Sequence, residues 1–166
     1  MIFEELIKDN KEEFLKAVND TATFLGVKPE WLMFVMWFET AHTLNPHIQN
    51  GITKATGLIQ FMPSTAKALG TSIDELMKMT NVEQMTYVKK YLSPAKGKCR
   101  SFVDLYCQIF WPKAVGKPDT FVITQDIVAK QNPIFDQNKD GDIAKYEIRK
   151  VLLNQIPVKY KPLFTA

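Results

Sequence analysis

The chain has 166 residues, of which 46% are hydrophobic and 23% charged, and its formal net charge is +3. This length and composition predict one globular domain, residues 1–166, with enough apolar side chains to bury a core. The lysines and arginines are scattered, which argues against a nucleic-acid-binding surface. Because each apolar run is too short to cross a bilayer, we expect no membrane insertion. We also expect the protein to be a monomer.

The amino terminus and the two cysteines bear on where the protein works. The opening Met-Ile-Phe-Glu-Glu has neither a basic region nor a long apolar region, so the sequence predicts no signal peptide and synthesis in the cytoplasm. Cys107 falls in a predicted helix, and Cys99 precedes it. Eight helical residues rise roughly 12 Å, which is too far for a disulfide, so both cysteines should be free thiols.

Residues 2–25 show helical periodicity in two pieces. The second piece should begin at Asn10, which together with Glu13 predicts a capping box, and it should end at Gly26. Pro29 fits the first turn of the next helix, where the missing N–H is not needed.

This next helix is the most apolar stretch of the chain. Residues 31–38 are almost wholly apolar, and a single carboxylate, Glu39, follows them. The stretch predicts a buried helix that carries an acid to the edge of the core, where a charge is costly unless it is paired or neutralised. Two interpretations are equally open: Glu39 turns to solvent as the helix ends, or it is a functional acid.

The remaining pattern is helical, apart from one polar stretch. Residues 42–57 predict a loop or small hairpin beside Glu39. A short helix should begin at Pro63 and stop at Gly70. Further helices are predicted from capping residues at Ser72, Thr80 and Ser101. The sequence therefore predicts a mainly α fold, a helical domain arranged around a central buried helix.

Residues 136–147 match the twelve-residue EF-hand calcium loop position by position. The ligands at the first, third, fifth, seventh and twelfth positions would be Asp136, Asn138, Asp140, the backbone carbonyl of Asp142, and Glu147. Gly141 provides the sharp turn at the sixth position, and a water would serve the ninth, Ala144. Hard oxygen ligands at this spacing predict one bound Ca²⁺.

The flanks of this loop predict its structural setting. Pro133 lies three residues before the loop, so the incoming helix should stop early, and the outgoing helix should cover residues 146–154. Sensor EF-hands usually work in pairs, and only one loop is visible here. We therefore predict a structural ion that pins the C-terminal region, in an EF-hand-like appendage spanning residues 124–155.

Taken together, the buried helix, the polar loop and the segment Gly57-Leu-Ile-Gln-Phe-Met-Pro63 resemble the lysozyme-like lytic transglycosylases, the family of soluble lytic transglycosylases and goose-type lysozymes. In that family a Glu near the end of a buried helix precedes a Gly-Leu-Met-Gln-x-Met-Pro segment and a short helix. Here the acid is Glu39, Thr40 stands where the family often has Ser, and Ile59 replaces the family's Met.

The family's Ala-Tyr-Asn-Ala-Gly motif has its nearest counterpart in Leu105-Tyr-Cys-Gln, where Tyr106 corresponds to the motif's Tyr. The segment that runs from Asp104 to Pro118 resembles the version in phage-encoded and prophage-encoded members, some of which also carry a calcium-loop sequence downstream. This resemblance implies that the protein acts on the cell wall in one of two ways: it is delivered as part of a phage virion assembly, or it is released as a free endolysin.

The resemblance implies an enzyme that cuts the β-1,4 bond between N-acetylmuramic acid and N-acetylglucosamine in the glycan strands of peptidoglycan. Glu39 would act as the single acid and base and give 1,6-anhydro ends, since burial raises a carboxyl pKa. The implied substrate-binding residues are Thr40, Gly57, Gln60, Met62 and Tyr106. Met62 could equally pack on a sugar ring or fill the core, and the Tyr106 hydroxyl could serve only to satisfy a buried partner. Asp104 fits a charge at a helix start better than a second catalytic acid.

Three alternatives stay open at this stage. Water in place of the sugar's 6-hydroxyl would make the protein a muramidase. A non-catalytic, calcium-dependent binding module could use the same helical scaffold. A calcium-sensing interaction protein would show a large change in exposed apolar surface when Ca²⁺ binds.

Overall fold

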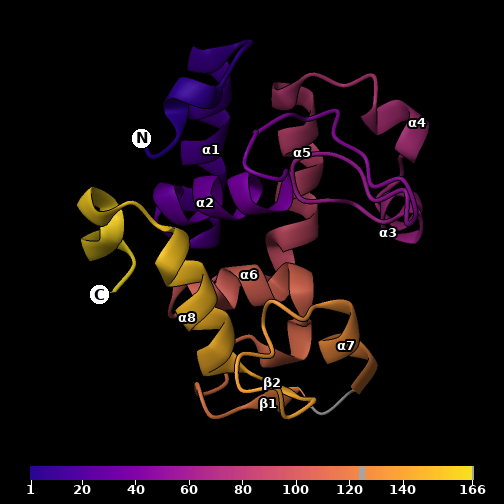
Figure 1. Ribbon diagram of the computed structural model, residues 1–166. Helices are drawn as coiled ribbons and strands as arrows, with labels where there is room; N and C mark the ends of the chain where they lie inside the picture. The colour runs from indigo at the N-terminus through magenta and orange to yellow at the C-terminus, as the bar shows by residue number, and fades with distance from the viewer. Residues whose placement is uncertain (124–125, 166) are drawn as a thin grey trace. The chain divides into compact units, whose positions relative to one another are not determined.

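The computed structural model describes residues 1–123 and 126–165 (Figure 1). The chain forms two compact units, Met1–Gly97 and Lys98–Ala166. The fold is mainly helical, as the sequence predicts, and the one sheet in the described residues has two strands. The division into one domain with an appendage at 124–155 stays a prediction, and its first two residues, 124 and 125, lie outside the described residues.

The first unit is built around the apolar helix α2 (Pro29–Glu39), which begins and ends where the sequence predicts. Residues 32–36 of this helix are fully buried. Helix α1 (Lys11–Leu25) packs against both α2 and α5 (Asn81–Leu92), and α2 lies across α1 in Figure 1. The shorter elements of this unit are the helices α3 (Pro63–Ala68) and α4 (Ile73–Leu76) and the 3₁₀ turns Glu4–Leu6 and Ser93–Ala95.

Local capping chemistry predicts some helix starts correctly and fails at one. Thr80 and Glu83 form the reciprocal capping box of α5. At the start of α1 the predicted capping box is wrong, because Asn10 adopts φ 52° and its side chain makes no cap hydrogen bond. The Asn10 amide instead donates to Oδ1 of Asn81 at 3.3 Å. A contact between distant segments has therefore replaced the local one.

The segment between α2 and α3 is the predicted polar loop. Two isolated antiparallel bridges, Gln49 with Thr56 and Thr56 with Phe61, give it a hairpin-like turn without forming named strands. This loop follows Glu39 directly and therefore determines which backbone groups lie near the end of α2.

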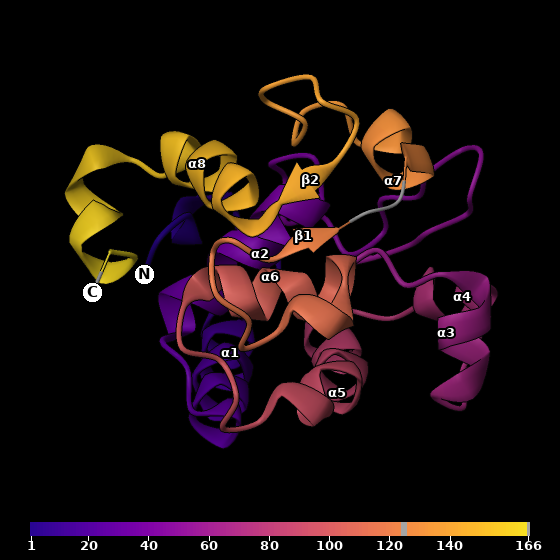
Figure 2. The ribbon, with the colours of Figure 1, turned by 90° about the horizontal axis from the view of Figure 1, so that it is seen from below.

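The second unit contains α6 (Phe102–Phe110), the 3₁₀ turn Pro112–Ala114, β1 (Val122–Ile123), α7 (Asp126–Gln131), β2 (Ile143–Ala144), α8 (Lys145–Gln155) and the 3₁₀ turn Val158–Leu163. β1 pairs antiparallel with β2, so that Ile123 lies opposite Ile143 (Figure 2). Helix α7 stops two residues before Pro133, and α8 covers the predicted outgoing helix.

The cysteine prediction is confirmed, since Cys99 and Cys107 are both free. Burial raises the pKa of each thiol to about 12, so neither is a reactive thiolate at neutral pH. Over the described ranges, the helices lack the combination of length and apolar character that a bilayer crossing requires.

Candidate active site

Helix α2 ends at a carboxyl group with a shifted pKa. Glu39 is the last residue of this helix, and its side chain is half-buried. Burial raises the pKa of Glu39 from 4.5 to about 7, because the charged form loses its hydration. Of the two interpretations that the sequence leaves open, this environment favours an acid that is partly protonated at neutral pH.

Aromatic rings cover the end of α2. Trp37 stacks on Phe3 at a centroid distance of 4.2 Å and on His42 at 4.0 Å, with interplanar angles of 14° in both pairs. Phe34 contacts both Trp37 and Phe38 from the preceding turn. These rings pack against one another along the last turn of α2, beside the half-buried Glu39.

Thr40, the residue after Glu39, shapes the chain at this point. Its side chain is fully buried. The hydroxyl donates to the Met36 carbonyl at 2.7 Å and accepts from the Leu44 N–H at 2.8 Å. The hydroxyl therefore ends the helix and fixes the following turn, while its predicted contact with substrate stays a prediction.

Gly57 lies where backbone comes close to a side chain. It has φ +86°, and a Cβ there would lie 2.5 Å from Oε1 of Gln84. Gln84 is fully buried and donates to the carbonyls of Pro46 and Leu76, while its Oε1 accepts from the Leu58 N–H at 3.0 Å. This α5 amide fixes the loop on which the predicted substrate-binding residues lie. Sequence reasoning missed Gln84, because nothing local marks a glutamine that bonds 26 residues upstream.

Gln60 and Met62 flank the next turn of the loop. Gln60 has φ 54°, and its Nε2 donates to the carbonyls of Ile48 at 3.3 Å and Gly57 at 3.2 Å. These bonds hold the amide in place, and none of the described residues donates a hydrogen bond to its Oε1. Met62 is 43% exposed, so of its two open roles, packing on a ligand fits better than filling the core.

Tyr91 of α5 is a second residue that the sequence did not single out. Its pKa is raised by burial and, to a smaller extent, by the negative charge of Glu39, so the phenol lies within electrostatic range of the carboxyl. Its ring meets Phe61 edge-on at a centroid distance of 6.3 Å. The proximity of Tyr91 to Glu39 depends on how the helices pack, so the sequence alone could not predict it.

Tyr106 lies in α6 of the second unit, where it is 3% exposed. Its ring stacks on Phe110 at 5.7 Å and contacts Phe135 at the same centroid distance. These contacts give Tyr106 a clear role in the core of its unit, and its predicted role toward substrate stays a prediction.

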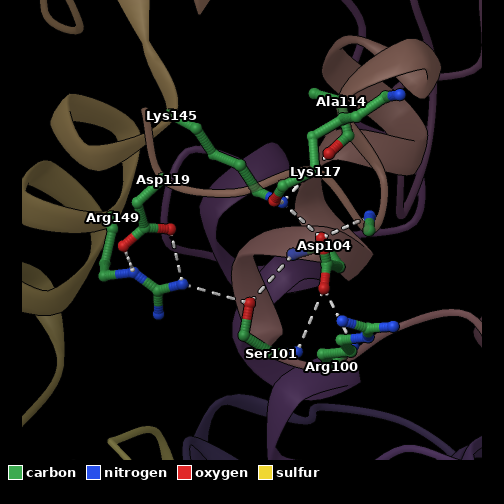
Figure 3. A network of polar contacts seen from close by, with 9 residues as sticks. Arg100, Ser101, Asp104, Ala114, Lys117, Asp119, Lys145 and Arg149 are labelled. Atoms are coloured by element: carbon green, nitrogen blue, oxygen red, sulfur yellow. Dashed lines mark hydrogen bonds and ion pairs between the residues drawn. The ribbon is translucent and has the colours of Figure 1, made fainter. Parts of the chain in front are cut away.

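Asp104 is buried together with a cation (Figure 3). Although burial would by itself raise its pKa, the hydrogen bonds from Lys145 and from the N–H groups of Gly116 and Arg100 hold the pKa of this carboxyl below its ordinary value. Lys145 also donates to the carbonyls of Ala114 and Lys117. Asp104 therefore stays ionised and forms the capping box of α6 with Ser101, as expected for a charge at a helix start.

In the predicted calcium loop, the donor set consists of carboxylate and amide oxygens, which is the chemistry that Ca²⁺ prefers. The Glu147 carboxylate accepts from the N–H groups of Gln137 and Ala144, and Asp136 accepts from that of Gly141. Asn138 donates to Asp140 at 2.8 Å. Within the described part of the chain, no three His, Cys, Asp or Glu side chains gather as a metal-binding group, so the ion remains a prediction from sequence.

The fold is a mainly helical domain in which the apolar helix α2 ends in a half-buried carboxyl group with a raised pKa. The sequence model of the family described as the transglycosylase SLT domain matches residues 16–103, more than half of the chain, and the chain belongs to this family. No match was found among curated proteins or among solved structures.

Members of the family are lytic transglycosylases, which are lysozyme-like glycosidases, and the chain is an enzyme of this kind with peptidoglycan as its substrate. The resemblance stated from sequence is confirmed at the level of the family. The matched residues include Glu39 and the segment 57–63, and they end before the calcium loop.

Proposed function

We propose that Glu39 is the single general acid and base of a lytic transglycosylase that cuts the β-1,4 bond between N-acetylmuramic acid and N-acetylglucosamine. The observation that carries this proposal is the raised pKa of Glu39 at the end of a buried helix. A protonated carboxyl can donate to a leaving oxygen at neutral pH, whereas an ordinary Glu with a pKa near 4.5 is almost wholly ionised there.

The proposed first step breaks the bond between C1 of N-acetylmuramic acid and the bridging oxygen. The Glu39 proton goes to that oxygen, and N-acetylglucosamine leaves as a neutral alcohol. The acetamido oxygen of the muramic acid residue attacks C1, so one carboxylate is enough where most glycosidases use two.

In the proposed second step, the ionised Glu39 accepts the proton of the 6-hydroxyl as O6 attacks C1. The acetamido group leaves C1, the 1,6-anhydro ring closes, and Glu39 is protonated again. Gln60 and the backbone near Gly57 would hold the acetamido groups by hydrogen bonds, and the exposed thioether of Met62 would pack on a sugar ring.

The experiment compares Glu39→Gln with Glu30→Gln, a matched change at the other end of α2. We expect Glu39→Gln to lower muropeptide release from purified sacculi by roughly 10²–10⁴-fold, the usual contribution of general acid–base catalysis, while Glu30→Gln keeps the activity. Mass spectrometry identifies the products, since anhydro ends are lighter than reducing ends by one water. Reducing ends would support the muramidase alternative, and activity in Glu39→Gln would exclude Glu39 as the acid.

We further propose that the loop 136–147 binds one structural Ca²⁺. The support is its match to the EF-hand pattern, with side-chain ligands from Asp136, Asn138, Asp140 and Glu147 and the backbone carbonyl of Asp142. The residue at the eighth position, Ile143, pairs with Ile123 of β1 within the same chain. The bound ion would tie Glu147, at the start of α8, to Asp136 at the beginning of the loop. The action on cell walls after phage delivery likewise remains a proposal from sequence resemblance.

A further inference from the structure

The first unit contains a cavity of about 720 Å³. Glu39, Gln60 and Tyr91 are not among the residues that line it. Three segments form its walls: residues 5–10 before α1, residues 42–47 after α2, and residues 80–81 at the start of α5. The volume is within the range of roughly 300–1,000 Å³ that is typical of ligand sites. None of the roles assigned above uses this cavity.

The cavity is held open by hydrogen bonds between its walls. Asn81 donates from Nδ2 to the Asp9 carbonyl at 2.8 Å and accepts from Asn10. The His47 ring bonds the Met79 carbonyl at 2.7 Å. All three segments are therefore fixed relative to one another, and a ligand would meet a preformed site.

Backbone strain is concentrated in the same walls. Asn10, His42 and Leu44 line the cavity with φ values of 52°, 71° and 56°. This left-handed region is unfavourable for residues with a Cβ, above all for one as bulky as leucine. Such conformations cluster at ligand sites.

The lining selects an uncharged ligand. The walls at 42–47 and 80–81 present amide, hydroxyl and imidazole groups and carry no Asp, Glu, Lys or Arg. The third wall has one cation, Lys8, beside the anions Glu5 and Asp9. An anion such as a phosphate would require a surplus of cations, which these walls do not provide.

Apolar and polar groups alternate around the cavity in a way that suits an amino sugar. Leu6, Ile7, Leu44 and Pro46 offer apolar surface for the face of a pyranose ring and for an acetamido methyl group. Asn45 and Thr43 lie among them and can meet hydroxyl and amide groups. His42 joins this wall to the active site, because its ring stacks on Trp37, two residues before Glu39.

We propose that this cavity is a second glycan-binding site, which holds an uncharged N-acetylhexosamine unit of a peptidoglycan strand away from the bond that is cut. This inference rests on the peptidoglycan substrate of the proposed function. A second site would keep the enzyme on an insoluble strand, since two linked contacts bind more tightly than either alone.

The test uses the full chain with Glu39→Gln, so that no glycan is cut, and chitotetraose, four β-1,4-linked N-acetylglucosamine units, as the probe. In nuclear magnetic resonance titrations we expect the backbone amide signals of residues 42–45, 47 and 80–81 to shift. Adding Lys8→Trp, which fills the cavity from an exposed position, should weaken binding at these residues by at least tenfold. Lys150→Trp on α8 makes the same exchange at an exposed position outside the cavity and should leave the binding unchanged.

Three outcomes would overturn the proposal. Chitotetraose could shift only the amides near Gln60 and Met62, or Lys8→Trp could bind it as well as Lys150→Trp does. A charged stem tripeptide of peptidoglycan could shift the cavity amides while chitotetraose does not. Because binding is measured on a variant that lacks the proposed acid, its result is independent of whether the wild-type chain releases anhydro muropeptides.

Discussion

The end of α2 and the start of α6 each carry a carboxyl group that is at least half-buried, and the pKa values of the two groups shift in opposite directions. At Glu39 burial raises the pKa to about 7, and the acid can carry a proton at neutral pH. At Asp104 hydrogen bonds from Lys145 and backbone N–H groups outweigh burial and keep the pKa low. Burial alone therefore does not mark a catalytic acid. The difference lies in whether the fold supplies donors for the charged form.

The largest expected effect comes from removing the cation beside Asp104. Lys145→Met should lower the free energy of unfolding by about 3–5 kcal/mol, because it leaves a buried carboxylate without its partner. Lys150→Met, at an exposed position of the same helix, should change it by less than about 0.5 kcal/mol. Urea denaturation without added Ca²⁺ measures the free energy of unfolding of both variants. The double variant Asp104→Asn with Lys145→Met should recover part of the loss, and a single variant as stable as wild type would contradict the assigned role of the ion pair.

The opposite result is expected at Glu39, where removing the charge should stabilise the fold. The folded pKa of about 7 exceeds the ordinary value of 4.5, so the wild type should lose stability as pH rises through this window. At pH 8 Glu39→Gln should gain about 3 kcal/mol over the wild type, and at pH 4 the two should be nearly equal. Thermal unfolding at both pH values measures this gain. An equal difference at the two pH values would show that ionisation of Glu39 is not its cause.

Calcium should stabilise the second unit. At a free concentration a hundred times the dissociation constant, Ca²⁺ should add about 2.7 kcal/mol to the free energy of unfolding. Glu147→Gln should remove most of this gain, whereas Glu30→Gln should keep it. A large rise in the fluorescence of an apolar dye with Ca²⁺ would instead support the calcium-sensing alternative.

The smallest effect concerns the pH dependence of cleavage. Glu39 must begin each turnover protonated, so kcat/KM should be half-maximal near pH 7 and fall about tenfold for each further pH unit. The release of soluble muropeptides from sacculi between pH 5 and 9 measures this profile. A rate that stays constant up to pH 9 would contradict the proposed role of the Glu39 proton.

Much of the local structure was predictable, because its determinants are local. Pro29 and Pro133 correctly placed a helix start and an early helix end, and Thr80 with Glu83 correctly predicted a capping box. Asn10 carried the same kind of local signal and was misleading. A side chain that can cap a helix can also bond a distant partner, here Asn81, and only the folded chain determines which bond forms.

The candidate site divides in the same way. Glu39 and the segment 57–63 could be singled out from residue types and spacing, and the family match covers both. Gln84 and Tyr91 could not, because each acts across a helix-to-loop or helix-to-helix contact between residues far apart in sequence.

The sequence by itself determined the helical class, the apolar helix that ends in an acid, the membership of the transglycosylase family and the oxygen-rich loop near the carboxyl terminus. Each of these depends on neighbouring residues and their spacing. The tertiary structure alone decided that Glu39 is desolvated while Asp104 is paired, and that three separate segments enclose a cavity. Desolvation, ion pairing and cavities arise from groups that meet only when the chain is packed.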